Sequence, residues 1–255
     1  MKISKAVLVC FSPTGGTRNA GRLAAARLGV PVEEVDVTAN CPERSFASDE
    51  LAVFAFPVYG GRIPAPMIGN LQKLKADGTP AVMLASFGNR AVDDAYLEMS
   101  DTAEKLGFVT VAGAEFVEPH SVNKSYGAGR PDYKDIEIMD EFVQKLKEKL
   151  EAVDRPEHFE LPGNRPYREY NGIPIKPKYK AKKCVSCGAC FSHCPTGAID
   201  KSKPEEFDSE KCISCMGCVS VCQKGARYIP LLMRFTGKMF LKKACSERQE
   251  PKYYI

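Results

Sequence analysis

Eight cysteines fall into two runs that share one spacing, C-x2-C-x2-C-x3-C. The first run begins at Cys184 and ends at Cys194, and the second begins at Cys212 and ends at Cys222. This spacing is typical of thiolate ligands to [4Fe–4S] clusters, in which the fourth cysteine of each run binds the other cluster. We therefore predict two clusters. Their ligand sets are Cys184, Cys187, Cys190 and Cys222 for the first, and Cys212, Cys215, Cys218 and Cys194 for the second.

Zinc and disulfides are the alternatives for these cysteines. Zinc sites usually pair two C-x2-C units across a longer gap, so a repeated four-cysteine run fits zinc poorly. Disulfides need an oxidising compartment, and residues 1–10 read as a strand that is too short for an export signal. We therefore expect clusters in a reducing cytoplasm. Cys10 is expected in the core, and no chemistry is assigned to Cys41 or Cys245.

A second group of candidate residues lies in the loop 12–17, which follows an apolar segment and leads into a helix ending at about residue 28. Hydroxyl groups and main-chain N–H groups at a helix N-terminus bind anions, and glycine lets the backbone approach them closely. The loop contains neither G-x-G-x-x-G nor G-K-[ST]. We predict a phosphate site; the alternative is a loop that caps its helix without a ligand. The candidate residues are Ser12, Thr14, Gly15, Gly16 and Thr17.

Strands and helices alternate along the first part of the chain and would position these residues. The predicted strands are 5–10, 31–37, 50–56, 80–86 and 109–117, and the later helices are 64–76, 91–106 and 134–153. Such alternation predicts an α/β fold with a doubly wound parallel sheet. In the strand order 2-1-3-4-5, ligands bind beyond the carboxyl ends of the strands, where the loops after strands 1, 3 and 4 meet.

The strand pattern and the loop 12–17 together resemble flavodoxin-like FMN proteins over about residues 3–152. The resemblance implies that the phosphate of FMN binds in this loop. It also implies that one side of the flavin ring is passed by Pro57, Val58, Tyr59 and Gly60. The other side would be flanked by Phe87, Gly88 and Asn89, with the Asn89 amide at the ring edge.

The chain departs from that family in one respect, because it has no tryptophan to stack on the flavin. Tyr59 is the best candidate for a ring contact; the alternative is ordinary packing of its loop. The expectation is therefore either looser flavin binding or an open flavin face. His120, after the fifth strand, is expected to form a loop hydrogen bond rather than to act as an acid.

The cysteine-rich segment resembles bacterial-type ferredoxins with two [4Fe–4S] clusters over residues 180–229. Pro195 follows the first run as in that family, whereas Gln223 replaces the second proline. This resemblance implies an α+β ferredoxin-like domain. The expected organisation is an FMN domain at 1–153, a proline-rich linker at 154–180, the cluster domain at 181–229 and an apolar, basic tail at 230–255.

Charge is divided unevenly between the two halves. Residues 1–153 carry a formal charge of −4, from 17 basic and 21 acidic residues, and residues 154–255 carry +8, from 19 and 11. The basic residues are scattered and the clusters would cancel part of the excess, so no nucleic-acid partner is expected. No window is long and apolar enough to predict a transmembrane segment.

The whole arrangement resembles the flavodoxin–ferredoxin fusion proteins of anaerobes, sometimes called EFR-type ferredoxins. The resemblance implies electron transfer between the two clusters, FMN and an unidentified redox partner protein. No catalytic residues are predicted, because no nucleophile–base pair is evident. A flavin-dependent reductase of a small substrate and a redox-responsive binding module are the alternatives. The opposite charges of the halves and the stiff linker suggest a homodimer in which FMN of one chain faces the clusters of the other.

Overall fold

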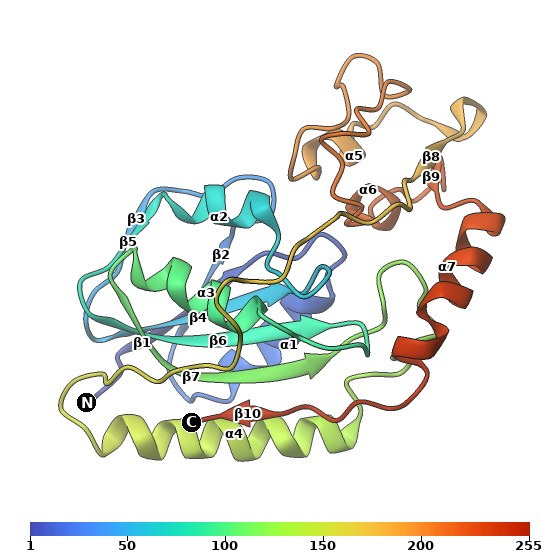
Figure 1. The fold of residues 1–255 in the computed structure, drawn as a ribbon. Coiled ribbons are helices and arrows are strands. Elements are labelled where there is room, and N and C mark those ends of the chain that lie inside the picture. Colours follow the sequence, from blue (N-terminus) through green and yellow to red (C-terminus); the bar gives the residue numbers. More distant parts are fainter.

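Five parallel strands and one antiparallel strand form the central sheet of the computed structural model, which describes residues 1–255 (Figure 1). The strands are β1 (Lys5–Cys10), β2 (Val32–Asp36), β4 (Glu50–Pro57), β6 (Thr79–Phe87), β7 (Phe108–Val117) and β10 (Tyr253–Tyr254). Their order is β10-β7-β6-β4-β1-β2. The five parallel strands thus have the predicted order 2-1-3-4-5.

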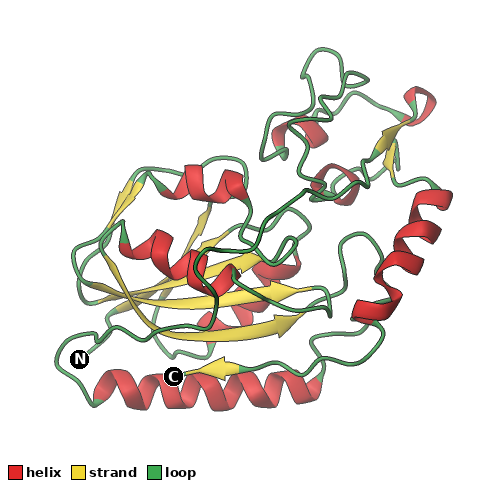
Figure 2. Ribbon diagram, in the orientation of Figure 1, coloured by secondary structure: helices red, strands yellow, loops and turns green.

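The sheet separates two apolar cores, which explains why its central strands are apolar on both faces. Every residue of β4 and β6 is buried. Helices α1 (Gly16–Ala26) and α4 (Tyr133–Glu151) contribute to the core on one face, and α3 (Ala95–Glu104) and α2 (Ala65–Leu71) to the core on the other. Figure 2 shows helices on both sides of the sheet.

Two predicted helices are shorter than expected because their ends have other partners. Helix α2 ends at Leu71, since strand β5 (Leu74–Lys75) pairs in parallel with β3 (Arg44–Ser45). Helix α3 begins at Ala95, after a loop in which Asn89 and Asp93 have positive φ. Neither change alters the order of the sheet.

The end of the chain returns to the first domain, which the sequence did not predict. Strand β10 pairs with β7 in an antiparallel sense, with Tyr253 opposite Ala114 and Tyr254 opposite Gly113. Helix α7 (Leu231–Cys245) connects the cysteine-rich region to this strand (Figure 1). The first domain therefore includes residues at both ends of the chain, and the predicted boundary at 153 describes only its first part.

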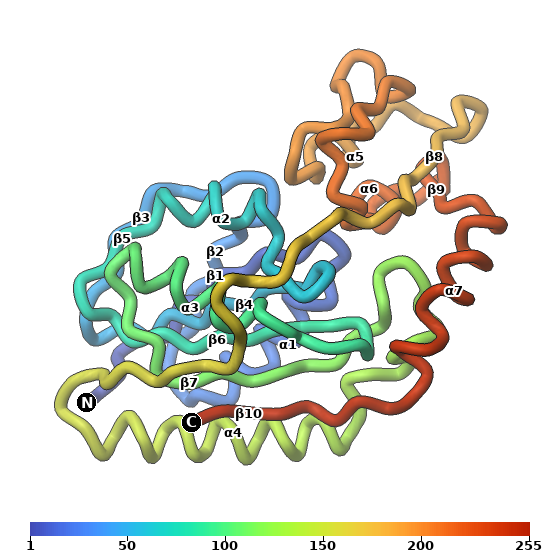
Figure 3. The backbone as a smooth tube through the Cα atoms, viewed as in Figure 1, coloured from blue at the N-terminus to red at the C-terminus, as the bar shows by residue number.

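The cysteine-rich region contains only short elements. They are β8 (Lys178–Tyr179), η1 (Ala181–Lys183), α5 (Ala189–Ser192), α6 (Gly217–Ser220) and β9 (Arg227–Tyr228). Strands β8 and β9 form a separate two-stranded antiparallel sheet. The proline-rich connector before β8 has no helix or strand and runs as an extended tube between the two regions (Figure 3). None of the helices combines the length and apolar character needed to cross a bilayer.

Candidate flavin and cluster sites

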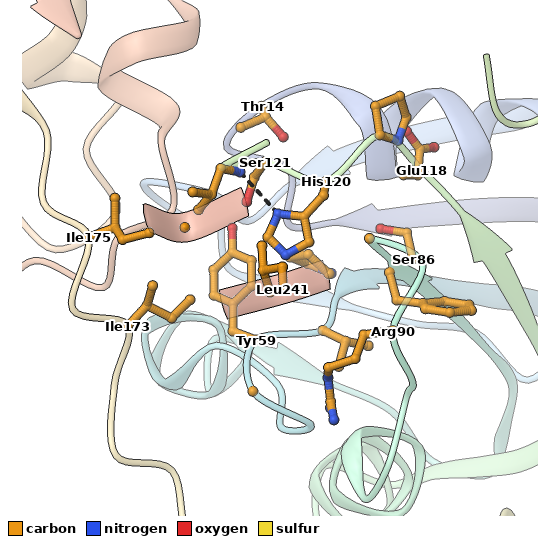
Figure 4. Close-up of a pocket in the computed structure, with 18 of the residues that line it drawn as sticks. Thr14, Tyr59, Ser86, Arg90, Glu118, His120, Ser121, Ile173, Ile175 and Leu241 are labelled. Atoms are coloured by element: carbon orange, nitrogen blue, oxygen red, sulfur yellow. Dashed lines mark hydrogen bonds between the residues drawn. The ribbon is translucent and has the colours of Figure 1, made fainter. Parts of the chain in front are cut away.

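A cavity of about 570 Å³ lies at the carboxyl ends of β1, β4 and β6 (Figure 4). The three loops that the sequence singled out meet around it, because parallel strands carry their following loops to one edge of the sheet. The predicted residues that line it are Thr14, Gly16, Thr17, Pro57, Val58, Tyr59, Gly60, Phe87 and Gly88.

Ser12 and Gly15 support the first loop from outside the cavity. The Ser12 hydroxyl accepts a hydrogen bond from the main-chain N–H of Arg18 at 3.0 Å. The main-chain N–H of Ser12 donates to Thr38 Oγ1 at 2.9 Å. Gly15 has a φ of 92° immediately before α1. The Ser12 oxygen stabilises the first turn of α1 as an acceptor, and its O–H stays free to donate, so the predicted phosphate contact remains a prediction.

Asn89 has a structural role that differs from the expected one. Its Nδ2 donates to the carbonyls of Cys245 and Glu247, at 2.7 and 2.8 Å, and its Oδ1 accepts from the N–H of Gln249 at 3.1 Å. The side chain does not line the cavity. The side-chain amide is therefore directed away from the predicted flavin edge, because it holds the C-terminal segment against the loop after β6.

Two hydroxyl groups meet inside the cavity wall. Thr17 Oγ1 and Ser86 Oγ are 2.5 Å apart and buried, and both residues line the cavity. Ser86 comes from the end of β6, where the sequence analysis assigned only a strand. Thr17 is thus held in place by a neighbouring strand.

The carboxyl group of Glu118 lies against the start of α1. It fills the space that a Cβ on Gly16 would take, and its buried Oε1 has no hydrogen-bond partner. Burial raises the pKa of Glu118 to about 7. The protonated form can donate a hydrogen bond to a phosphate or ribityl oxygen, whereas the ionised form would repel a phosphate. The cavity fits FMN when Glu118 is neutral. The sequence analysis did not assign Glu118 to the site, although a carboxyl group directly after the fifth parallel strand is a signal that could have indicated it.

His120 forms the expected loop hydrogen bond and also lines the cavity. Its Nδ1 accepts from the N–H of Val122 at 3.2 Å, which leaves Nε2 as the protonated nitrogen of the neutral ring. Burial, together with the charge of Arg90, lowers the pKa of His120 to about 4. The ring takes the space of a Cβ on Gly88, so this glycine is required for the close approach.

Tyr59 lies between the cavity and the second cysteine run. Its side chain is 9% exposed. Burial raises its pKa well above the usual value, and the nearby Cys215 and Tyr170 act in the same direction. The hydroxyl therefore stays protonated. The ring is available as an apolar wall between the two cofactor sites.

The connector and helix α7 cover the cavity, which the sequence analysis missed. Their lining residues are Gly172, Ile173, Pro174, Ile175, Thr236, Gly237, Phe240 and Leu241. Gly237 brings α7 close to Ile175 and Val122. Segments far along the chain thus form one wall of the cavity in which an open flavin face was predicted. No local signal in either segment indicated that role.

The two cysteine runs repeat one backbone conformation. Ser186 and Ser214 have φ values of 52° and 57°, and each N–H points to the sulfur two residues earlier, at 3.4 Å for Cys184 and 3.3 Å for Cys212. Helices α5 and α6 follow at matching positions. Main-chain N–H groups directed at cysteine sulfur tune and stabilise iron–sulfur clusters. The repeated conformation fits two such clusters.

Cys194, the fourth cysteine of the first run, lies near Cys215 and Cys218 of the second run, with which it is predicted to share a cluster. Burial, together with the nearby Cys194 and Cys212, raises the pKa of Cys215 to about 12. In the first ligand set, the sulfur of Cys222 accepts hydrogen bonds from the main-chain N–H groups of Ala226 and Arg227, at 3.2 and 3.4 Å. Since β9 pairs with β8, this part of the chain returns to the start of the first run.

No three His, Cys, Asp or Glu side chains converge as ligands of a single metal ion. A cube-shaped cluster requires a different arrangement, because each of its thiolates binds a separate iron atom. The two sets also differ in exposure, since Cys215 and Cys218 are each 8% exposed whereas Cys187 is exposed to solvent. The second set is therefore the inner one.

The two regions contact each other within one chain. Pro13, in the loop after β1, presents its carbonyl to His193 Nε2 at 2.7 Å and to the Ser220 hydroxyl at 3.1 Å. The connector contacts both regions, because the Tyr170 ring fills the space beside Gly60 and the Ser214 hydroxyl donates to the carbonyl of Ile173 at 2.9 Å. The connector therefore does not hold the two regions apart.

Comparison with known proteins identifies the cysteine-rich part. Residues 176–223 match the family model of a 4Fe-4S dicluster domain. No curated protein matches the chain.

The solved structures that are similar to the chain include two flavodoxins. One is from the domain Archaea, with 14% identity, a TM-score of 0.42 and coverage of 58% of this chain and 99% of that one. The flavodoxin of Streptococcus pneumonia TIGR4 has 17% identity, a TM-score of 0.39 and the same coverage. Rubredoxin oxygen:oxidoreductase from Desulfovibrio gigas has 16% identity and a TM-score of 0.39, over 59% of this chain and 37% of that one. These low values carry no information on what the chain binds.

The order of the parallel sheet and the matched cysteine segment together define the organisation of the chain. It consists of a flavodoxin-like doubly wound α/β domain followed by a 4Fe-4S dicluster domain, the arrangement of a flavodoxin–ferredoxin fusion.

Proposed function

We propose that the chain transfers electrons between two [4Fe–4S] clusters, held by the cysteine runs, and FMN, held in the cavity. When bound, the clusters would supply one-electron steps and FMN would accept one or two electrons. The observation that carries the proposal is the position of Tyr59. This buried side chain lines the cavity and is close enough to Cys215 for the thiol to affect its pKa.

The chain's own residues bind and orient the cofactors in this proposal. Thr14, Gly16 and Thr17 would hold the phosphate at the start of α1, where main-chain N–H groups point outward. The loop at 57–60 and residues Phe87 and Gly88 would flank the ring. The inner thiol set would hold a cluster beside Tyr59, and the more exposed set would hold the cluster that faces a redox partner.

Tyr59 would exclude water from the region between the cavity and the inner cysteines, whereas Tyr170, at the edge of this region, is 38% exposed. Tyr59 is buried, and the pKa of Tyr170 is raised by burial and by the nearby Cys212 and Cys215. A dry, fixed spacer between two redox sites avoids solvent rearrangement during transfer. The main-chain contacts of Pro13 with His193 and Ser220 keep that spacing constant.

Cofactor content is the first test. Anaerobically purified protein is expected to contain about eight irons, eight sulfides and one flavin that is FMN, because each run supplies one cube. Thr14→Ala with Thr17→Ala should weaken FMN binding by about 2 kcal/mol, since each hydroxyl contributes about 1 kcal/mol. Thr102→Ala, whose hydroxyl donates inside α3, is the control. About four irons, or unchanged FMN affinity in the double variant, contradicts the proposal.

Transfer between the sites is the second test. Stopped-flow mixing of oxidised protein with a strong one-electron donor should bleach the cluster absorbance and then the flavin absorbance. Flavin that stays oxidised for minutes beside reduced clusters, with a donor able to reduce it, would show that the sites are not connected.

A flavin-dependent reductase is the second candidate function, and the apolar cover of the cavity favours it. Ile173, Ile175 and Leu241 line the cavity beyond the loops expected to hold the flavin. An apolar wall beside the neutral His120 ring could orient a small apolar substrate. Rapid multiple turnover with one small oxidant, at a rate far above that of free FMN, would support an enzyme over an electron carrier.

The homodimer remains a proposal based on the opposite charges of the two halves. The reason drawn from the linker no longer supports it, because the two regions of one chain are in contact through Pro13. Sedimentation at several protein concentrations tests the dimer. A monomer at every concentration would contradict it.

A further inference from the structure

Helix α7 carries an unusual concentration of exposed apolar side chains. Five of the nine exposed large hydrophobic residues of the chain lie on it, with exposed fractions from 56% to 86%. They are Leu231, Leu232, Phe235, Met239 and Phe240. An exposed patch of this kind in a folded protein marks an interaction surface.

The opposite side of α7 is already occupied. Gly237 and Cys245 are buried, and Gly237 lies against Ile175 and Val122. The Tyr126 hydroxyl donates to the carbonyl of Lys238 at 2.8 Å. The helix is therefore fixed to the molecule by its inner side, and its outer side is free to bind something else. In Figure 1 it lies at the edge of the molecule, outside the sheet.

The charged residues of α7 are all basic. Arg234, Lys238, Lys242 and Lys243 accompany the apolar residues, and the helix from 231 to 245 contains no aspartate or glutamate. Basic side chains beside large apolar ones are typical of helices that lie in the interface of an anionic membrane. Their long stems can lie along the apolar surface while the charges reach the lipid headgroups.

We propose that the outer side of α7 docks the protein on the surface of an anionic lipid bilayer. A bilayer supplies both an apolar layer and negative headgroups, and it needs no matching groove for a convex helix. A second copy of the chain fits less well, because packing α7 on α7 would place the four cations of each helix together without a carboxylate on either.

The position of α7 gives the docking a consequence for the cavity. Phe240 is 86% exposed and also lines the cavity, so the docking surface and the cavity rim share a residue. Docking would place this side of the cavity at the lipid surface. The proposal does not depend on which cofactor the cavity holds.

Sedimentation with vesicles tests the proposal on the full-length protein with its cofactors. The protein should pellet with vesicles of phosphatidylglycerol and phosphatidylcholine in equal amounts, and much less with phosphatidylcholine alone. Lys238→Gln with Lys242→Gln should weaken binding about 20- to 30-fold, since one basic residue near an anionic surface contributes a factor of about five. Lys2→Gln with Lys134→Gln removes two exposed lysines elsewhere and should leave binding unchanged.

The apolar contribution is tested by Leu232→Ser with Phe235→Ser, which should weaken binding at least tenfold. Tyr133→Ser is the matched control, because Tyr133 is a large side chain that is 69% exposed on α4. Flavin and cluster absorbance shows that each variant keeps its sites. Added salt should weaken the binding of the native protein.

Fluorescence offers a second readout because the chain has no tryptophan. The tryptophan emission of the Phe235→Trp variant should shift to shorter wavelength when anionic vesicles are added. The emission of the Tyr133→Trp variant should not shift. A protein that stays in the supernatant, or one that the control lysine pair affects equally, overturns the proposal. It is also overturned if the protein forms dimers without lipid that Leu232→Ser with Phe235→Ser dissociates, since α7 would then be a self-association surface. The proposal is also overturned if the protein binds an acidic protein through α7 but does not bind vesicles.

Discussion

Arg227 is a buried charge in the cluster domain that has no carboxylate partner. Its side chain is 2% exposed, it donates to the carbonyl of Pro204, and its Nε has no partner. The guanidinium lies 5.0 Å from the centre of the Tyr179 ring. A buried cation without a counter-charge is costly. Burial raises the pKa of Cys218 and the charge of Arg227 opposes that rise, while at Cys184 the same charge adds to the hydrogen bonds of Tyr179 and Ser186 that lower the pKa. Arg227 therefore lies near cysteines of both runs, and the anionic clusters would supply the missing counter-charge.

Replacing Arg227 should lower the reduction potential of a cluster. A nearby cation stabilises the reduced, more negative state, so Arg227→Gln is expected to shift the potential down by about 50–100 mV. That figure corresponds to about 1–2 kcal/mol of charge interaction at an effective dielectric constant near 20. Potentiometric titration followed by EPR measures it. Lys224→Gln is the control, because that lysine is exposed and lies even nearer to the second run in sequence than Arg227 does. Equal potentials in native and Arg227→Gln protein would contradict this role.

Glu118 should make FMN binding depend on pH. Its pKa is raised to about 7, so the carboxyl is neutral below that pH and ionised above it. The ionised form lies at the predicted phosphate site, so FMN affinity is expected to fall about tenfold, or ~1.4 kcal/mol, as the pH rises through 7. Fluorescence titration of apoprotein measures it. Glu118→Gln should abolish the fall, and riboflavin, which lacks the phosphate, should not show it; the same slope for riboflavin would exclude the phosphate as the cause.

At the scale of elements, the C-terminal segment from α7 to β10, here called the strap, connects the cluster domain back to the sheet of the first domain. Helix α7 leaves the cluster domain, covers the cavity and continues to β10, which pairs with the edge of β7. Asn89 fixes this segment through three hydrogen bonds. An added strand also protects the outer edge of β7 from pairing with other chains.

Loss of the Asn89 side chain should loosen the strap without removing a flavin ligand. Asn89→Gly keeps a backbone that tolerates the φ of 62° and removes all three hydrogen bonds. We expect the free energy of unfolding to fall by about 1–3 kcal/mol. Hydrogen exchange should become faster in α7 and β10 while the parallel strands stay protected. Unchanged exchange in β10, with FMN affinity lost instead, would favour the flavin contact that the sequence first suggested.

At the scale of the whole molecule, the two domains form one unit. The connector runs between them and contacts both, and the loop after β1 contacts the cluster domain through Pro13. The inner cysteines lie on the side of Tyr59, and the exposed Cys187 belongs to the outer set. This arrangement suggests a route from a partner through the outer cluster and the inner cluster to the cavity.

Transfer within one chain should be independent of protein concentration. The rate of flavin reduction after the clusters are reduced is expected to stay constant over a wide dilution range. His193→Ala with Ser220→Ala removes both contacts to the Pro13 carbonyl and should slow this step. His158→Ala, which removes an exposed histidine of the connector, is the control. A rate proportional to concentration would instead show transfer between molecules, as the crossed dimer requires.

Local patterns were enough to predict several features of this protein. The cysteine spacing indicated two clusters, and the family match at residues 176–223 confirmed the kind of domain. The alternation of strands and helices predicted a parallel sheet with helices on both faces, and the resemblance to flavodoxin-like proteins implied the strand order that the sheet has. The loops at 12–17, 57–60 and 87–89 were expected at one edge of the sheet, and that edge has the cavity.

The remaining features depend on contacts between residues far apart in sequence. The partners of Asn89 come 156 to 160 residues later, so these contacts could not be predicted from its own loop. Glu118, the connector and α7 line the cavity only because the whole chain folds back over the sheet. The short pairing of β10 with β7 has no hydrophobic periodicity to reveal it. Spacing along the chain determined the chemistry, whereas the tertiary structure decided which residues enclose it, because enclosure depends on the path of distant segments.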